Sequence, residues 1–278
     1  MDSSGQASVS ARPAARGASA ARRAKVVEVD NLVTHFSGVG EAMLKGVSVT
    51  VHEGEIMVIM GGSGSGKTTL LRHMIGLDTP TSGGVKILGR DITKLNAGEM
   101  YHMRKSMGVS FQGGAMFNSM TVGENLKLPL REHTRLAEPQ MEIMTRMKLA
   151  FVNLEVETAQ KLPSELSGGM LKRAALARAI MMDPKLLFCD EPSAGLDPAV
   201  SAAIDDLILR LRDAMNMSIV VVTHERASAF KIADRITMLD KGRVLMTGTL
   251  EELRASDNKR IHDLLEGVPE ETEVGAWI

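Results

Sequence analysis

Apolar and polar positions follow two different periods along this chain from about residue 26 onward. Residues 47–51 alternate with a period of two, and residues 56–60 form the continuous apolar run of a buried strand. Short apolar runs at 186–189, 219–222 and 236–239 are typical of strands covered on both faces. A Gly-rich turn and a helical stretch at 68–77 follow the second strand, and apolar residues recur at helical spacing from Val200 to Met215. This order predicts an α/β fold with a largely parallel core sheet.

The segment from about residue 119 to 178 has a different pattern. It contains few strand signals and several Met and Leu residues at helical spacing, so we expect a mainly helical insert within the α/β chain. Methionine fills cores but also suits adaptable binding surfaces. We assign most methionines here to the core; the set is Met100, Met103, Met107, Met116, Met120, Met141, Met144 and Met147.

Composition excludes several classes of protein. With 278 residues, of which 44% are apolar, the chain can bury a substantial core. A net charge of -1 argues against nucleic acid as the main partner. The apolar runs are far shorter than the ~20 residues of a membrane span, so we expect a soluble chain. The single cysteine, Cys189, excludes an internal disulfide and fits a reducing compartment.

Both ends of the chain differ from its middle in amino-acid composition. Residues 1–25 are rich in Ala, Ser and Arg, and we interpret them as a disordered basic tail. A transit peptide and an arm that binds anionic lipids remain alternatives. Residues 263–278 form a short acidic stretch that we also interpret as a tail. The main domain is therefore predicted at 26–262.

A glycine-rich loop follows the strand at 56–60 and matches the pattern G-x-x-x-x-G-K-[ST]. In such a loop, backbone N–H groups and a helix N-terminus surround phosphates. Lys67 would neutralise the β- and γ-phosphates, and Thr68 would supply an oxygen to Mg²⁺. The sequence thus predicts an ATP site with Mg²⁺, made by Gly61, Gly62, Ser63, Gly64, Ser65, Gly66, Lys67, Thr68 and Thr69.

Two carboxylates end the apolar run at 186–189. Asp190 at the strand end suits the Mg²⁺ shell, usually through water. Glu191 would face the γ-phosphate and orient or deprotonate the attacking water. An acidic strand end alone is common. It indicates a nucleotide site here because the same chain also contains the phosphate loop. Cys189 on this strand is expected to be a small core residue.

Over residues 26–262 the sequence resembles the nucleotide-binding subunits of ABC transporters. Six motifs carry the resemblance: the phosphate loop, Phe111-Gln112, Leu166-Ser167-Gly168-Gly169-Met170, Asp190-Glu191, Ser193-Ala194-Gly195-Leu196-Asp197 and Thr223-His224. The resemblance implies a P-loop NTPase fold of ABC type. Such a fold has a mixed, mostly parallel core sheet, an antiparallel β subdomain and a helical insert. It also implies a head-to-tail homodimer in which two subunits enclose two ATP molecules.

The resemblance assigns roles to residues outside the phosphate loop. Ser167, Gly168 and Gly169 would bind the γ-phosphate held by the partner's loop, and Asp197 would line the subunit boundary. Gln112 would sense the γ-phosphate and Mg²⁺, and His224 would hydrogen-bond the γ-phosphate. Glu191, His224 and Gln112 are thus the expected catalytic residues, and Thr68, Gln112 and Asp190 the expected metal site. For adenine stacking the candidates are Phe36 and then His35, with a core position of Phe36 as the alternative.

Three segments resemble one branch of this family, the ATPases of Mla/Mce-type phospholipid transporters. They are residues 111–117, 129–134 and 162–170, the last of which carries Met170 where most ABC proteins have Gln. Leu196 and the short acidic tail depart from the best-known members, which carry Gln and a longer C-terminal extension. The resemblance implies a peripheral protein at the cytoplasmic face of the inner membrane. Its partners would be an integral-membrane permease and an MCE-domain lipid-binding protein, and a small regulatory subunit is left open.

Two other functions remain as alternatives. One is the ATPase of another small-molecule importer, and the other is a soluble ABC ATPase of DNA repair or translation. The permease is expected to bind a groove on the insert after Gln112, and the best groove candidates are Met116, Phe117 and Met120.

Overall fold

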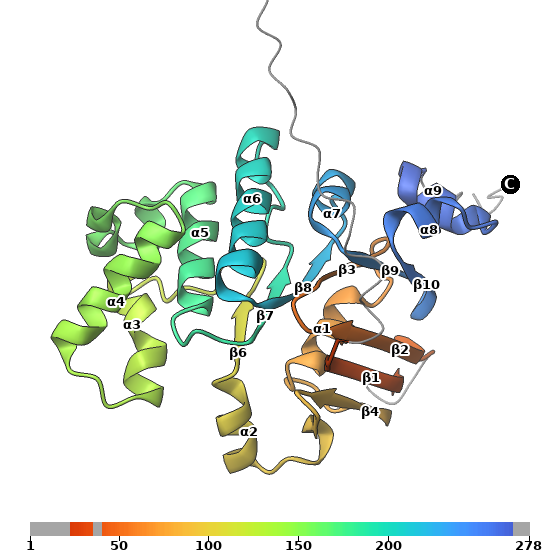
Figure 1. Cartoon of the computed structure of the whole chain (residues 1–278), viewed down its shortest axis with the longest axis horizontal. Coiled ribbons are helices and arrows are strands. Elements are labelled where there is room, and N and C mark those ends of the chain that lie inside the picture. The colour runs from red at the N-terminus through yellow and green to blue at the C-terminus, as the bar shows by residue number, and fades with distance from the viewer. Residues whose placement is uncertain (1–22, 36–40, 269–278) are drawn as a thin grey trace, which may run out of the picture.

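Two β-sheets form the centre of the computed structural model, which describes residues 23–35 and 41–268 (Figure 1). The larger sheet has six strands in the spatial order β10 (Arg243–Gly248), β9 (Arg235–Asp240), β3 (Ile56–Met60), β8 (Ser218–Thr223), β7 (Leu186–Asp190) and β6 (Met107–Ser110). The smaller sheet has four strands in the order β2 (Leu44–His52), β1 (Lys25–Thr34), β4 (Ser82–Ile87) and β5 (Arg90–Asp91).

The larger sheet is mixed, as predicted. β6, β7, β8, β3 and β9 pair in parallel, and only β10 runs antiparallel to its neighbour. Every residue of β3, β7 and β8 is buried. Strands covered on both faces need apolar side chains at consecutive positions, which explains the continuous apolar runs in the sequence. The α/β fold class is confirmed.

The two faces of this sheet support two separate cores. Because side chains alternate along a strand, Val58 packs with the helices on one face, whereas Met57 and Ile59 pack with the smaller sheet and α1 (Lys67–Met74) on the other. Figure 1 shows α5, α6 and α7 on the side of the sheet opposite α1. The smaller sheet is antiparallel, since β1 pairs in that sense with both β2 and β4. Short helices η2 (Ile92–Lys94) and α2 (Ala97–Arg104) lead from it to β6.

Parallel register aligns the ends of three strands that carry site residues. Met60 of β3 lies opposite Thr223 of β8, and Asp190 of β7 lies opposite Val222 of β8. The loops that follow these strands therefore leave the sheet at the same edge. This is where ligands bind in open parallel sheets.

The described structure of residues 119–178 is helical and contains no strand. Its elements are α3 (Val122–His133), α4 (Glu138–Phe151), η3 (Val156–Gln160), η4 (Pro163–Glu165) and the first part of α5 (Gly168–Ala179). Thr121 begins α3 with a capping box, in which its hydroxyl accepts from the Glu124 N–H and the Glu124 carboxylate accepts from the Thr121 N–H. Such caps satisfy N–H groups that have no partner inside the helix.

The methionines divide between core and surface. Met100, Met103, Met107 and Met141 are buried, which is half of the set assigned mostly to the core. Met116 and Met144 pack partly against the helical core, whereas Met147 is 64% exposed. Among the groove candidates, Phe117 is 58% exposed.

The remaining helices are α6 (Pro198–Met215), α7 (Arg226–Ile232), α8 (Leu250–Arg254) and α9 (Lys259–Glu266). The predicted domain end at residue 262 falls inside α9, so that boundary is placed too early. Ile261 and Leu265 of α9 are buried in the helical core, and this packing continues the fold past the predicted end. Residues 1–22 and 269–278 of the two predicted tails lie outside the described residues. In the part that the structure describes, no helix is both long and apolar enough to span a membrane.

Candidate functional site

The glycine-rich loop connects β3 to α1 and depends on glycine at two positions. A side chain at Gly61 would place its Cβ only 2.0 Å from the carbonyl oxygen of Leu239. Gly66 caps α1 in the left-handed conformation with φ at 102°, which residues with a Cβ rarely adopt. These constraints hold the loop in a tight turn directly before the helix N-terminus.

The interior of this loop is shaped for an anion. A Cβ added at Gly62 or Gly64 would meet no atom within 4 Å, so space remains there for a ligand. The Ser65 hydroxyl is buried and has no hydrogen-bond partner among the described residues. Phosphate oxygens would give this donor an acceptor and would lie at the positive end of α1. The loop therefore fits phosphate.

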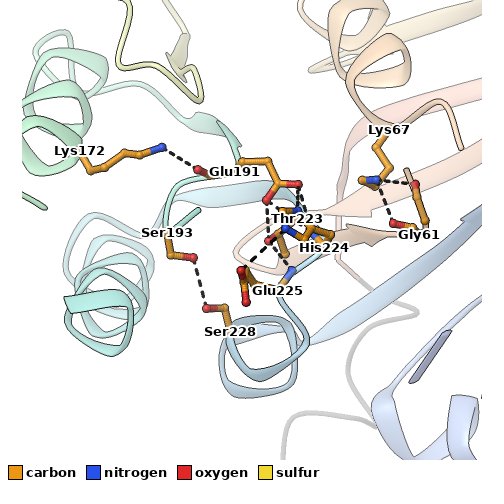
Figure 2. A network of polar contacts seen from close by, with 10 residues as sticks. Gly61, Lys67, Lys172, Glu191, Ser193, Thr223, His224, Glu225 and Ser228 are labelled. Atoms are coloured by element: carbon orange, nitrogen blue, oxygen red, sulfur yellow. Dashed lines mark hydrogen bonds and ion pairs between the residues drawn. The ribbon is translucent and has the colours of Figure 1, made fainter. Parts of the chain in front are cut away.

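Lys67 folds back over the loop. Its ammonium donates to the carbonyl oxygens of Gly61 at 2.9 Å and Gly62 at 2.8 Å (Figure 2). Burial lowers the pKa of Lys67, while the charges of Glu191 and Asp190 act in the opposite direction. The ammonium is thus already positioned at the mouth of the loop, and a phosphate would replace carbonyl partners with a charged one.

Asp190 ends β7 with an unsatisfied carboxylate oxygen. Its Oδ1 atom is buried and has no hydrogen-bond partner within the described residues. Burial and the neighbouring charge of Glu191 raise the pKa of Asp190. A divalent cation would offset both effects, because it would coordinate the oxygen and compensate the two negative charges.

The donor set fits Mg²⁺ in particular. Among residues 23–35 and 41–268, no group of three or more His, Cys, Asp and Glu side chains could hold a metal ion by itself. Mg²⁺ does not need such a group, because it is usually bound by one or two carboxylates, substrate phosphates and water. Asp190 and Thr68 would supply protein oxygens here.

Glu191 is buried and its carboxylate is held from two sides (Figure 2). The Thr223 hydroxyl donates to Oε2 at 3.0 Å, and the His224 backbone N–H donates to Oε1 at 3.1 Å. His224 Nδ1 also lies 2.7 Å from Oε1. The Glu191 backbone has a left-handed φ of 48°, and its N–H donates to Val222 at 2.8 Å. A carboxylate fixed in this way is suited to orient a water molecule or accept its proton.

His224 and Gln112 are both accessible. The His224 side chain is 58% exposed, although its Nδ1 atom contacts Glu191. Both residues follow strands of the larger sheet, because His224 comes directly after β8 and Gln112 comes shortly after β6. His224 also lines an open hollow of about 350 Å³ beside the glycine-rich loop. The structure thus places His224 beside the loop, and its contact with the γ-phosphate stays a prediction.

The Ser167–Gly169 segment and Asp197 form a second hollow of about 430 Å³. Ser167 caps α5 and its hydroxyl accepts from the Met170 N–H at 3.3 Å. Asp197 caps α6 and accepts from the N–H groups of Ala199 and Val200 at 3.1 Å each. A Cβ at Gly169 would lie 2.6 Å from the Val200 side chain, so glycine permits this close approach of α5 and α6.

The two hollows share no lining residue among those described. Within one chain the structure therefore does not bring Ser167 and Gly169 to the glycine-rich loop. If both segments contact one nucleotide, two chains must supply them.

Of the two candidates for adenine stacking, the structure describes His35. Phe36 lies outside the described residues. His35 is exposed, and its backbone N–H donates to the Thr81 hydroxyl at 3.2 Å.

The structure adds residues that sequence reasoning missed. Lys172 of α5 is buried and donates to the backbone carbonyls of Gln112 and Glu191. Its position three residues before Ala175 and four before Leu176 places a lysine on the apolar face of a helix, a signal that the sequence did contain. Helix α9 also lines the hollow beside the glycine-rich loop through Arg260 and Leu264. No local sequence pattern predicts that contact, because it depends on how α9 packs against the rest of the domain.

Comparisons with known proteins agree on one family. Residues 44–194 match the family described as ABC transporter. The chain is 40% identical to the intermembrane phospholipid transport system ATP-binding protein MlaF of Haemophilus influenzae, over 87% of this chain and 90% of that protein. It is 39% identical to the probable ribonucleotide transport ATP-binding protein mkl of Mycobacterium tuberculosis, over 87% of this chain. The match spans 66% of the mycobacterial protein, just under two thirds of its length.

A solved structure gives the same result. The dimeric structure of a post-hydrolysis state of an ATP-binding cassette bound to ADP and Pi is similar, with a TM-score of 0.75 and 32% identity. The match covers 81% of this chain and 98% of that one.

Proposed function

The chain belongs to the ABC transporter family, and from this membership we propose that it is the ATP-hydrolysing subunit of a membrane transporter that moves phospholipids. One arrangement carries the enzymatic part of the proposal: the oriented carboxylate of Glu191 lies between Thr223 and His224, on the sheet edge that also holds the glycine-rich loop. A protein that only bound nucleotide would not need a buried carboxylate held in this way.

The site residues have separate roles in ATP hydrolysis. Backbone N–H groups of residues 61–66 and the ammonium of Lys67 bind the phosphates. Thr68, Gln112 and Asp190 would hold Mg²⁺, which would neutralise charge on the β- and γ-phosphates. Glu191 orients the attacking water and accepts its proton. His224 hydrogen-bonds the γ-phosphate.

Two copies of the chain form the complete site. Ser167, Gly168 and Gly169 of one subunit bind the γ-phosphate held by the other subunit's loop, and Asp197 lines the boundary between them. The separation of the two hollows supports this arrangement, because the α5 N-terminus favours an anion and the glycine-rich loop of the same chain lines a different hollow. The similarity to a dimeric cassette supports it as well. Isologous pairing of two identical chains then gives two equivalent ATP sites.

The phospholipid substrate rests on the comparison with MlaF, which is named for intermembrane phospholipid transport and matches over 90% of its own length. Partners would be an integral-membrane permease and an MCE-domain lipid-binding protein, with a small regulatory subunit as a further candidate. The chain would act as a peripheral protein at the cytoplasmic face of the inner membrane. The permease would contact the insert near Phe117, whose side chain is 58% exposed.

Ribonucleotide transport is the second candidate, since the mycobacterial relative named for that transport is 39% identical. The phospholipid assignment is preferred because the match spans nearly the whole of MlaF but only 66% of the mycobacterial protein.

Two experiments test the proposal. Purified protein should hydrolyse ATP in the presence of Mg²⁺, and Glu191→Gln should bind ATP and dimerise without turnover; near-normal turnover of this variant would refute the catalytic assignment. Purification from native membranes should then recover a permease and an MCE-domain protein. Recovery of ribosomal or DNA-repair proteins instead would overturn the transport function. Transport in vesicles reconstituted with labelled phospholipid or with a labelled ribonucleotide separates the two substrates.

A further inference from the structure

Lys172 is a buried cation in α5, the helix that begins directly after Ser167. The residue is 9% exposed, and its ammonium donates to the backbone carbonyl of Glu191 at 2.9 Å (Figure 2) and to the backbone carbonyl of Gln112. These partners lie 19 and 60 residues from it in the sequence. One side chain therefore joins α5 to the two segments that carry the catalytic carboxylate and the sensing glutamine.

Lys172 holds its charge at a buried position of α5. Burial lowers the pKa of Lys172, while Glu191 and Asp190 counteract this effect. Its neighbours on the same helix, Ala174, Ala175 and Leu176, are buried apolar residues. Removing the ammonium would leave the carbonyl oxygens of Gln112 and Glu191 without this donor. The contacts of Lys172 thus hold α5 against the segments that follow β6 and β7.

The same helix reaches the other nucleotide site. Ser167 caps α5 five residues before Lys172, which corresponds to about 7.5 Å along the helix axis. Ser167 lines the hollow that faces the partner's ATP in the proposed dimer, whereas Gln112 and Glu191 serve the ATP of their own subunit. A rigid helix with one contact at each site can transmit a displacement between them.

We propose that Lys172 is a positioning residue that couples the two ATP sites of the dimer: nucleotide bound at the partner's site fixes α5 through Ser167, and Lys172 passes this position to Glu191 and Gln112 of its own subunit. This inference rests on the proposed function. It predicts that the rate of hydrolysis at one site depends on occupancy of the other, and that this dependence runs through the Lys172 ammonium.

The test uses two full-length chains joined in tandem, so that each site is altered separately. The second chain carries either Glu191→Gln, which keeps its site filled with ATP but inactive, or Lys67→Ala, which leaves its site empty. The ratio of the single-turnover rates of the first chain, filled over empty, measures the coupling. With an unmodified first chain we expect a ratio of about 5 to 150, the usual range for coupling between two sites.

Lys172→Met in the first chain should bring the ratio to about one, because methionine fills the space without donating a hydrogen bond. Lys172→Arg keeps the charge and the donors and should retain the ratio. The matched control is Lys148→Met, since Lys148 is a largely buried lysine that pairs with Asp183 within the helical region. The control should keep both the ratio and the rate of the unmodified chain.

The outcomes are decisive in both directions. An unchanged ratio in Lys172→Met, or an equal loss in Lys172→Met and Lys172→Arg, overturns the inference, because the donors would then be irrelevant. If Lys172→Met does not fold, or hydrolyses ATP too slowly to measure, Lys172→Leu, which also lacks a donor, is judged by the same ratio. Absence of ATP hydrolysis in the unmodified tandem would refute the proposed function itself, which is a different result.

Discussion

Thr223 offers a quantitative test of how Glu191 is held. Its hydroxyl is buried, donates to Glu191 Oε2 at 3.0 Å and accepts from the Glu225 N–H at 3.0 Å. Thr223→Val keeps the volume of the side chain and removes both hydrogen bonds. A hydrogen bond to a charged group contributes roughly 1.5–3 kcal/mol. If this orientation matters mainly in the transition state, kcat should fall about 10- to 100-fold.

The assay is steady-state ATP hydrolysis at saturating ATP and Mg²⁺, with the Kd for ATP measured separately. We expect kcat to fall and the Kd to stay near the value of the unmodified protein, because Thr223 contacts Glu191 and not the phosphate loop. Such a split identifies an interaction made chiefly in the transition state. The unfolding midpoint should also fall, since the Glu225 N–H loses its acceptor.

A matched substitution separates orientation from stability. Thr237 on β9 is buried, and its hydroxyl lies 2.9 Å from that of Thr247. Thr237→Val should lower the free energy of unfolding by about 1 kcal/mol and leave kcat unchanged. If Thr223→Val hydrolyses ATP at the unmodified rate, or if Thr237→Val loses as much activity, then the Thr223 hydrogen bond does not orient the catalytic carboxylate.

Three further predictions concern the phosphate loop and the metal. Lys67→Ala should weaken ATP binding in a nucleotide titration, and unchanged affinity would count against the loop. Gly61→Ala should destabilise the protein by about 1–3 kcal/mol in denaturant unfolding, because its Cβ would lie 2.0 Å from the Leu239 carbonyl oxygen; equal stability would contradict this close approach of the loop to β9. Burial and Glu191 raise the pKa of Asp190, so its charged form is disfavoured in the folded state and costs stability as the pH rises through that pKa. Without Mg²⁺, Asp190→Asn should therefore raise the unfolding midpoint at neutral pH but not at a pH below the ordinary pKa of aspartate, and it should abolish the stabilisation that Mg²⁺-ATP produces.

The elements with local signals were predicted well from the sequence. Strands β3, β7 and β8 are buried on both faces, so each needs an uninterrupted apolar run, and such a run is visible in a single sequence. The phosphate loop is local for a similar reason, because one short segment supplies the glycines, the lysine and the helix start.

The end of the domain and the contacts between distant side chains are harder to predict from the sequence. The end of the domain was placed too early because α9 is short and its burial depends on packing of Ile261 and Leu265 against distant residues. The sequence and the family resemblance name Glu191 and His224 as site residues but predict no contact between them. These residues are 33 positions apart, and only the parallel register of β7 and β8 brings them within 2.7 Å.

Local sequence is sufficient to predict the alternation of strands and helices, the phosphate loop, and the motifs that place this chain among ABC proteins, because each of these depends on residues close together in the chain. The folded arrangement is needed to show that Lys172 contacts Gln112 and Glu191, and that the α5 N-terminus lies in a hollow apart from the phosphate loop. Contacts of this kind depend on the register between strands and on how closely helices pack. Both are set by the whole core, and no single segment encodes them.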